Sequence, residues 1–424
     1  MPYPAQLQPY QSQLNASDPV SVTDLESKVN GEDGILYAQE AGRIAQLNGD
    51  FALSQKLYAH AIARYDKADF DPTISVSNLG ANATSVLLND NVIPYRGPGF
   101  ERIMLHQYQA LNYLMQGDSE GALVEVRRAN ELQTLEQERY RKSLSDSNAI
   151  ENGTVQTEIN RLKGSSKASS SFLNAYSYYV TGLLYQMAGE PNDAFIDYRK
   201  AAQLHQGNPY LEQELVRLAK GLQMPQYQEF KDKWGDAQPI TPDQGRLVVI
   251  YETGFSPAKQ AFSVPFRVNR RWQSVSLPTY LGQRPSYAAA YIKLGNDARI
   301  QAATISDIDD LATTALAEEL PLILVRQAAR VYAKAEANQW ARERDDWGGV
   351  AMEVFNLISE QADLRSWLTL PSEAQIAHQN LTAGSYPLQI NAKLAETIEI
   401  KPGQTTLVWA IQTGGHLRLF SQIF

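Results

Sequence analysis

The sequence predicts an α+β protein in two parts, an all-α helical-repeat region followed by a mixed α+β region with an antiparallel sheet or sandwich. Apolar residues recur at helical spacing from Ile35 to about Trp234, whereas short β-branched and aromatic runs dominate later. The proline-containing stretch DAQPITPDQG separates the two patterns. We therefore expect an extended arm at 1–31, a helical repeat at 32–234, a linker at 235–245 and an α+β region at 246–424.

The α+β region has strand signals on both sides of a helical stretch. LVVIYETG and AFSVPFRV come first. Helices are expected at 306–362, with Ser306 as N-cap, acidic residues in the first turn, and Pro321 as a break or kink. Five runs separated by turn residues then predict a β-meander: AQIAHQNL, SYPLQI, ETIEI, TTLVWAIQ and LRLFSQIF.

The helical region repeats one hairpin pattern three times. When the copies are aligned on Gly49, Gly117 and Gly189 as turn residues, small and aromatic residues fall at shared offsets. The matching positions are Gly42, Ala45, Ser54, Tyr58 and Ala61; Ala110, Tyr113, Ala122, Val126 and Ala129; and Gly182, Tyr185, Ala194, Tyr198 and Ala201. This pattern is that of the tetratricopeptide repeat (TPR), whose period is about 34 residues.

The spacing of the copies predicts further structure. The turn glycines lie about two TPR periods apart, so we expect degenerate helical pairs between them, including NLGANATSVLLND at 78–90. LEQELVRLAKGL at 211–222 would cap the stack. Because a single hairpin cannot bury its apolar face, the hairpins must stack, and stacking creates a groove of the kind that binds peptides.

Composition narrows the classes of function. The formal net charge of −9 argues against a nucleic-acid partner, since phosphate binding requires concentrated Lys and Arg. The chain has no cysteine, which excludes disulfides, thiolate nucleophiles and Cys-ligated zinc. No stretch approaches the roughly 20 apolar residues that span a bilayer. A signal peptide begins with a basic segment followed by an apolar one. The first residues, MPYPAQLQPYQSQ, contain neither, so we expect no signal peptide there.

Two long motifs are more specific than the repeat. One runs from Tyr95 to Arg128, with YRGPGFERI, HQYQALNYL and ALVEVRR; the other comprises LVVIYETGFSPAKQ, QADLRSWLTLP and LTAG. Over about 35–420 the chain resembles a family of poorly characterised TPR-containing lipoproteins of Gram-negative bacteria.

The resemblance implies a periplasmic location. It implies attachment to the outer membrane through an N-terminal lipidated cysteine, and a place near peptidoglycan-synthesis activator lipoproteins. This sequence has no lipobox and no cysteine. Either a leader was removed or replaced, or this member is not lipidated.

The polar residues of the first motif form the candidate partner-binding site. Glu101 and Asn112 are expected to face the groove, and Glu125 and Arg128 to pair at i, i+3. The candidate set is Tyr95, Gly97, Glu101, His106, Asn112, Tyr113, Glu125 and Arg128. The alternative is a structural network that fixes the YRGPG loop, with His106 packed inside its hairpin.

A second group of candidates lies where the helical stretch meets the next strand. Asp363, Arg365 and Trp367 occupy this junction. A buried Asp–Arg pair that braces the corner is favoured over a binding site.

No motif for catalysis, a metal or a cofactor is present. The five histidines lack metal-ligand spacing, and no nucleophile elbow, phosphate-binding loop or dinucleotide fingerprint occurs. The sequence favours a non-enzymatic cell-envelope scaffold or adaptor that binds a protein partner through a TPR groove. One alternative is a carbohydrate- or peptidoglycan-binding envelope protein, and another an enzyme with an unrecognised site. The sugar alternative depends on Trp272, Tyr280, Tyr287, Tyr291, Trp340, Trp347, Trp367 and Trp409. Oligomeric state and partner identity stay open.

Overall fold

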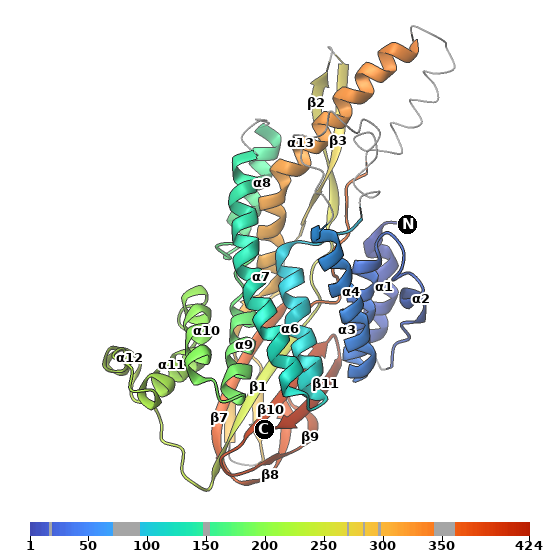
Figure 1. Ribbon diagram of the computed structural model, residues 1–424. Helices are drawn as coiled ribbons and strands as arrows, with labels where there is room; N and C mark the ends of the chain where they lie inside the picture. The colour runs from blue at the N-terminus through green and yellow to red at the C-terminus, as the bar shows by residue number, and fades with distance from the viewer. Residues whose placement is uncertain are drawn as a thin grey trace.

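The structure is a computed structural model. It describes residues 1–16, 19–70, 94–146, 153–268, 271–282, 285–295, 298–342 and 361–424. Helices occupy the N-terminal half and strands dominate the C-terminal half, as predicted (Figure 1). The predicted helix at 78–90 lies outside the described residues.

The three predicted hairpins are present. They are α3 (Gly34–Leu47) with α4 (Phe51–Phe70), α6 (Gly99–Met115) with α7 (Ser119–Asp146), and α9 (Ala175–Met187) with α10 (Pro191–Leu204). Each hairpin turns at its predicted glycine. The φ angle is 80° at Gly49, 80° at Gly117 and 76° at Gly189. In the first turn the Asp50 N–H donates to the carbonyl of Ala45. This hydrogen bond caps the C-terminal end of α3 and requires a left-handed backbone conformation at Gly49.

The other helices of the first half are α1 (Tyr3–Leu14), α2 (Thr23–Glu26), α8 (Gly153–Ser165), α11 (Pro209–Gly221) and α12 (Tyr227–Trp234). Helix α1 corrects the expectation of an extended arm at 1–31. Leu7 and Leu14 are fully buried, and the carbonyl of Leu14 accepts hydrogen bonds from Thr413 and Arg418. The polar arm sequence therefore folds through contacts with residues near the other end of the chain.

The strands form three sheets. A five-stranded sheet has the order β11-β10-β1-β7-β6, a four-stranded sheet the order β5-β4-β8-β9, and β2 pairs with β3 alone. Their bounds are β1 (Gln244–Thr253), β2 (Gln260–Val268), β3 (Arg271–Thr279), β4 (Tyr291–Leu294), β5 (Ala298–Gln301), β6 (Ala303–Asp307), β7 (Glu373–Thr382), β8 (Gly384–Ile390), β9 (Lys393–Ile400), β10 (Thr405–Thr413) and β11 (His416–Ile423).

The predicted β-meander is wrong, although all of its five strands exist. They divide between two sheets, and β1 lies between β7 and β10, parallel to β10. The five-stranded sheet is thus mixed rather than antiparallel. The reason lies in β1, which is buried on both faces and therefore suits the centre of a sheet, where both of its edges are paired.

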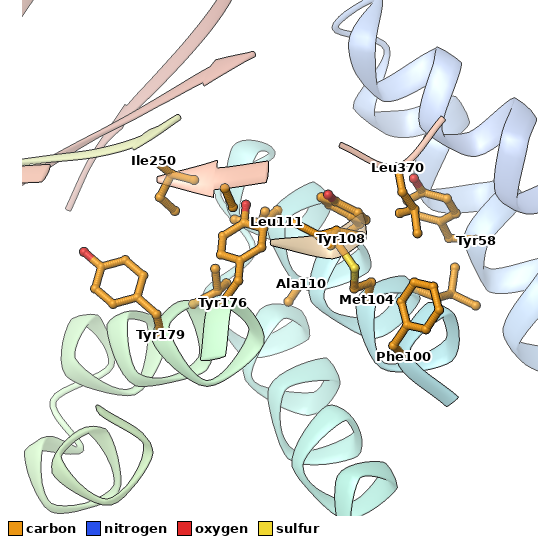
Figure 2. Packing of buried hydrophobic residues seen from close by; sticks show 14 of the residues in the cluster. Tyr58, Phe100, Met104, Tyr108, Ala110, Leu111, Tyr176, Tyr179, Ile250 and Leu370 are labelled. Atoms are coloured by element: carbon orange, nitrogen blue, oxygen red, sulfur yellow. The ribbon is translucent and has the colours of Figure 1, made fainter. Parts of the chain in front are cut away.

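Alternating residues of β1 define three layers. Leu247, Val249 and Tyr251 pack against the four-stranded sheet, as a sandwich requires. Val248 and Ile250 point the other way, into the core shared with the helices. Figure 2 shows Ile250 facing Tyr176 and Tyr179 of α9. Helices, a mixed sheet and a second sheet therefore follow one another, and the helical half and the sheet share one hydrophobic core.

Helix α13 (Ile308–Arg342) differs in detail from its prediction. It passes through Pro321 without ending there. Buried neighbours such as Leu320 and Leu324 pack against α8 and the β2–β3 hairpin, with which α13 projects from the layers (Figure 1). Ser306 belongs to β6, and the Asp307 carboxylate accepts the N–H of Asp310 at 2.9 Å, so Asp307 performs the N-cap role expected of Ser306.

Candidate functional site

A buried ion pair joins the helices to the central strand. Arg43 of α3 contacts Glu252 of β1, and their side chains are 1% and 0% exposed. The hydroxyls of Tyr108 on α6 and Tyr176 on α9 donate to the same carboxylate at 3.0 and 2.6 Å. One acidic residue of β1 thus holds the first helix of each hairpin.

An irregular segment is inserted between the helices and the sheet. We call residues 365–370 the inserted segment. The Glu40 carboxyl of α3 accepts the N–H groups of Leu368 and Thr369 at 2.7 and 3.1 Å, together with the Thr369 hydroxyl. The Glu101 carboxyl of α6 accepts the Trp367 N–H at 2.9 Å. The helices therefore bind this segment by its backbone.

Burial changes the acidity of both carboxyl groups. It raises the pKa of Glu40 to about 8, against the lowering effect of the hydrogen bonds from Thr369 and Leu368. It raises the pKa of Glu101 to about 7, against the hydrogen bonds from Trp367 and Tyr95. Each group is enclosed and fully engaged by the protein, which is the environment of a structural brace.

Most of the predicted partner-binding residues lie inside the protein. Tyr95, Glu101, His106, Asn112 and Glu125 are all buried. Their placement contradicts the expectation that Glu101 and Asn112 line an open groove. The inner side of the helices carries the inserted segment and the five-stranded sheet, so these side chains bind their own chain.

The hydrogen bonds of these residues match the alternative of a structural network. The Tyr95 hydroxyl donates to Glu101 at 2.5 Å, and Asn112 bonds Gln46 and Ser54 at 2.7 and 2.9 Å. The Glu101 carboxyl also holds the inserted segment, so the network extends from the YRGPG loop to the C-terminal half.

The remaining predicted residues lie around the second hairpin. His106 is packed as expected, with Nδ1 2.6 Å from Glu125. Glu125 pairs with the half-exposed Arg128 at 3.3 Å, which confirms the predicted i, i+3 contact. Gly97 has a φ of +37°, and a Cβ atom added there would lie 2.9 Å from the Glu101 carboxylate. Tyr113 is half-buried.

The predicted junction contains the expected pair and one further partner. Arg365 is 5% exposed and contacts Asp363 at 2.7 Å. It also contacts Asp33 at 2.5 Å, which sequence reasoning did not identify because Asp33 lies far away in the chain. Trp367 is fully buried, with its ring edge-on to Tyr58 and Tyr108.

Two of the aromatic residues proposed as sugar platforms lie in the core and not at the surface. Trp367 and Trp409 are fully buried, and Tyr291 is exposed on β4. The side chains of Trp272 and Trp340, and all of Trp347, lie outside the described part of the structure. The two buried rings have no face available for stacking.

A hollow at the end of the helical array was not predicted. It lies between α10, α11 and α12, has a volume of about 320 Å³, and we call it the terminal cavity. The half-buried rings of Phe230 and Trp234 form one wall, with centroids 4.9 Å apart. The signal in the sequence was their i, i+4 spacing in the otherwise charged helix YQEFKDKW, which indicates one apolar face.

Charged groups line the same cavity. Arg199, Glu212 and Lys233 contribute to its wall. Among the residues that the structure describes, none of the three forms an ion pair, although the Lys233 ammonium lies 4.8 Å from the centre of the Trp234 ring. His205, also in the wall, has a pKa lowered by burial. The terminal cavity therefore combines an apolar wall with charges available to a ligand.

Comparison with known proteins gives no relative from which to transfer a function. No protein-family model matches the chain, and neither does any curated protein. In the described ranges, no group of three or more acidic or histidine side chains could hold a metal ion. Of the helices in those ranges, none is both long and apolar enough to cross a membrane.

Proposed function

We propose that the chain is a non-enzymatic scaffold or adaptor of the cell envelope, with a TPR-like helical array that binds a protein partner at the terminal cavity. The observation that carries the proposal is the contrast between two polar surfaces. The polar groups on the inner side of the helices are engaged by β1 and the inserted segment. By contrast, Arg199, Glu212 and Lys233 line an open hollow and form no ion pair with any residue that the structure describes.

The TPR-like arrangement is supported by close helix packing at small residues. A Cβ atom at Gly42 would lie 2.5 Å from the Tyr58 ring, and one at Gly182 would lie 2.9 Å from the Tyr198 ring. The same small–aromatic pairing thus brings the helices together in the first and third hairpins. The envelope location rests on the resemblance of the two long motifs, and fractionation of cells that produce the protein tests it.

A second cavity is larger but offers less to a partner. It has a volume of about 510 Å³ and lies beside Tyr3 and Tyr37. Its charged lining residues, Asp33 and Arg365, already pair with each other. A ligand there would have to compete with this ion pair, so we assign partner binding to the terminal cavity.

The peptidoglycan-binding alternative is less well supported. Two of its proposed platforms, Trp367 and Trp409, are fully buried, so neither ring has a face available for stacking on a sugar. Co-sedimentation of the full chain with purified peptidoglycan tests this alternative, and saturable binding would favour it.

Photo-crosslinking tests partner binding at the cavity. A photoreactive phenylalanine analogue replaces Gln203, an exposed residue of the cavity wall, or Gln228, an exposed residue of α12 outside that wall. We expect a discrete adduct with one protein from position 203 and not from position 228. Equal labelling at both positions, or no adduct, would contradict the proposal.

A further inference from the structure

We infer that the terminal cavity binds an internal peptide segment of the partner in which side-chain carboxylates flank a large apolar side chain. This inference rests on the proposed function and specifies the ligand of the same site. Three properties of the wall lead to it: its size, its cations and its aromatic pair.

The size of the cavity limits the ligand. A volume of about 320 Å³ is at the lower end of the range of small-molecule and cofactor pockets, roughly 300–1,000 Å³. A hollow of this size accepts one or two side chains of an extended segment and excludes a helix or a folded surface.

The cations define the polar part of the ligand. Arg199 on α10 and Lys233 on α12 reach the cavity from separate helices. In a chain with a net charge of −9, two cations in one wall without an ion pair among the described residues select a negatively charged ligand. Two carboxylates on one segment satisfy both cations, and a guanidinium can hold one of them in a bidentate contact.

The aromatic pair defines the apolar part. Phe230 and Trp234 remain half-buried in the wall, and the buried Leu215 lies beside them. A Phe or Leu side chain that covers this surface removes apolar area from water, which stabilises the complex. Arg199 and Lys233 line the same cavity as this apolar wall, so acidic residues on both sides of the apolar one can each reach a cation.

Glu212 completes the site as an acceptor. Its carboxylate lies in the α11 part of the wall. Elsewhere in this chain, Glu40 and Glu101 use their carboxyl groups to accept backbone N–H groups of the inserted segment. Glu212 offers the same contact to the backbone of the bound segment and so favours an extended peptide over a free organic acid.

Fluorescence anisotropy with defined peptides tests the inference on the full chain. The first probe is an acetylated, amidated, fluorescein-labelled peptide with an Asp-Phe-Asp core; the second has an Asn-Phe-Asn core; the third has the Asn-Phe-Asn core and a free C-terminal carboxylate. We expect the first probe to bind at least on the order of tenfold more tightly than the second, and more weakly as salt is added.

Charge variants assign the contact. Arg199→Gln and Lys233→Gln should each weaken binding of the first probe by on the order of fivefold, as expected for partly exposed ion pairs. Lys231→Gln is the matched control, because Lys231 pairs with Asp236 and does not line the cavity. A loss with Lys231→Gln equal to that with Arg199→Gln would overturn the inference, as would equal binding of the first two probes.

The remaining outcomes separate this inference from the proposed function. Tightest binding of the third probe would overturn the internal segment in favour of a chain end. If no probe binds while the adduct at position 203 forms, the ligand class is wrong and partner binding stands. If the adduct is also missing, the proposed function itself fails.

Discussion

The carboxyl group of Glu101 accepts the backbone N–H of Trp367 at 2.9 Å, although 266 residues separate the two in the chain. Glu40 holds the next two N–H groups in the same way. Side chains that bind a backbone impose little demand on the sequence of the bound segment. The helices of this protein therefore bind an irregular segment by its backbone, and that segment belongs to their own chain.

The ion pair between Arg43 and Glu252 should be a major determinant of stability. Removal of one partner leaves the other buried and unpaired, so Arg43→Met and Glu252→Gln should each lower the free energy of unfolding by about 3–5 kcal/mol. The double variant should lose less than the sum of the two. Urea unfolding of the complete cycle measures this coupling, and additive losses would contradict it.

Stability should decline as the pH rises above about 5. Glu40 and Glu101 have folded-state pKa values of about 8 and about 7, above the ordinary 4.5. The folded protein thus binds these protons more tightly than the unfolded chain. The contribution of these two protons to the free energy of unfolding is complete below about pH 4.5. It is lost as the pH rises through about 7 and then 8, by about 1.4 kcal/mol per pH unit for each carboxyl.

Two variants supply the control for this pH dependence. Glu40→Gln and Glu101→Gln remove one titrating group each and keep an oxygen that can accept the backbone N–H groups. The free energy of unfolding, measured from pH 5 to pH 9, should depend less steeply on pH in each variant. A slope identical to that of the unmodified protein would show that these groups titrate alike in the folded and unfolded chains.

Close packing of α3 on α4 should be sensitive to one methyl group. A Cβ at Gly42 would meet the Tyr58 ring at 2.5 Å, so Gly42→Ala should destabilise the protein by about 1–3 kcal/mol. Gly221→Ala is the control, since its Cβ would meet nothing within 4 Å, and it should be neutral or stabilising by up to about 1 kcal/mol. Thermal unfolding measures both changes. Equal effects would refute the packing argument.

Asn112 should matter for folding and not for partner binding. Asn112→Ala removes the partner of the buried Gln46 amide and Ser54 hydroxyl, which should cost about 1–3 kcal/mol. The adduct at position 203 should still form at a temperature where the variant is folded. Loss of the adduct from a folded variant would return partner binding to the Tyr95–Arg128 motif.

Local features of the fold could be predicted from the sequence, and long-range pairings could not. The hairpin turns depend on Gly49, Gly117 and Gly189, whose conformational freedom is visible in the residue type. The position of β1 between β7 and β10 depends on strands distant in the chain, which no local pattern encodes. Helix α1 is likewise stabilised by distant contacts, through Leu14 to Thr413 and Arg418.

The candidate site shows the same division. The pairing of Glu125 with Arg128 followed from their spacing on one helix. The contact between Glu101 and Trp367 could not be predicted in this way. An acidic residue on the first helix of a hairpin gives the same sequence pattern whether it binds a peptide of another protein or residue 367 of its own chain. The terminal cavity requires α12 to pack beside α10, and only the spacing of Phe230 and Trp234 hinted at an apolar face there.

Hydrogen exchange of the full chain with and without its crosslinked partner tests the central claim most directly. The claim is that the partner occupies the terminal cavity while the inserted segment stays bound between helices and sheet. Slower exchange should be confined to α10, α11 and α12, with exchange of residues 365–370 unchanged. Faster exchange of the inserted segment on partner binding would mean that the partner displaces it, and would contradict the claim.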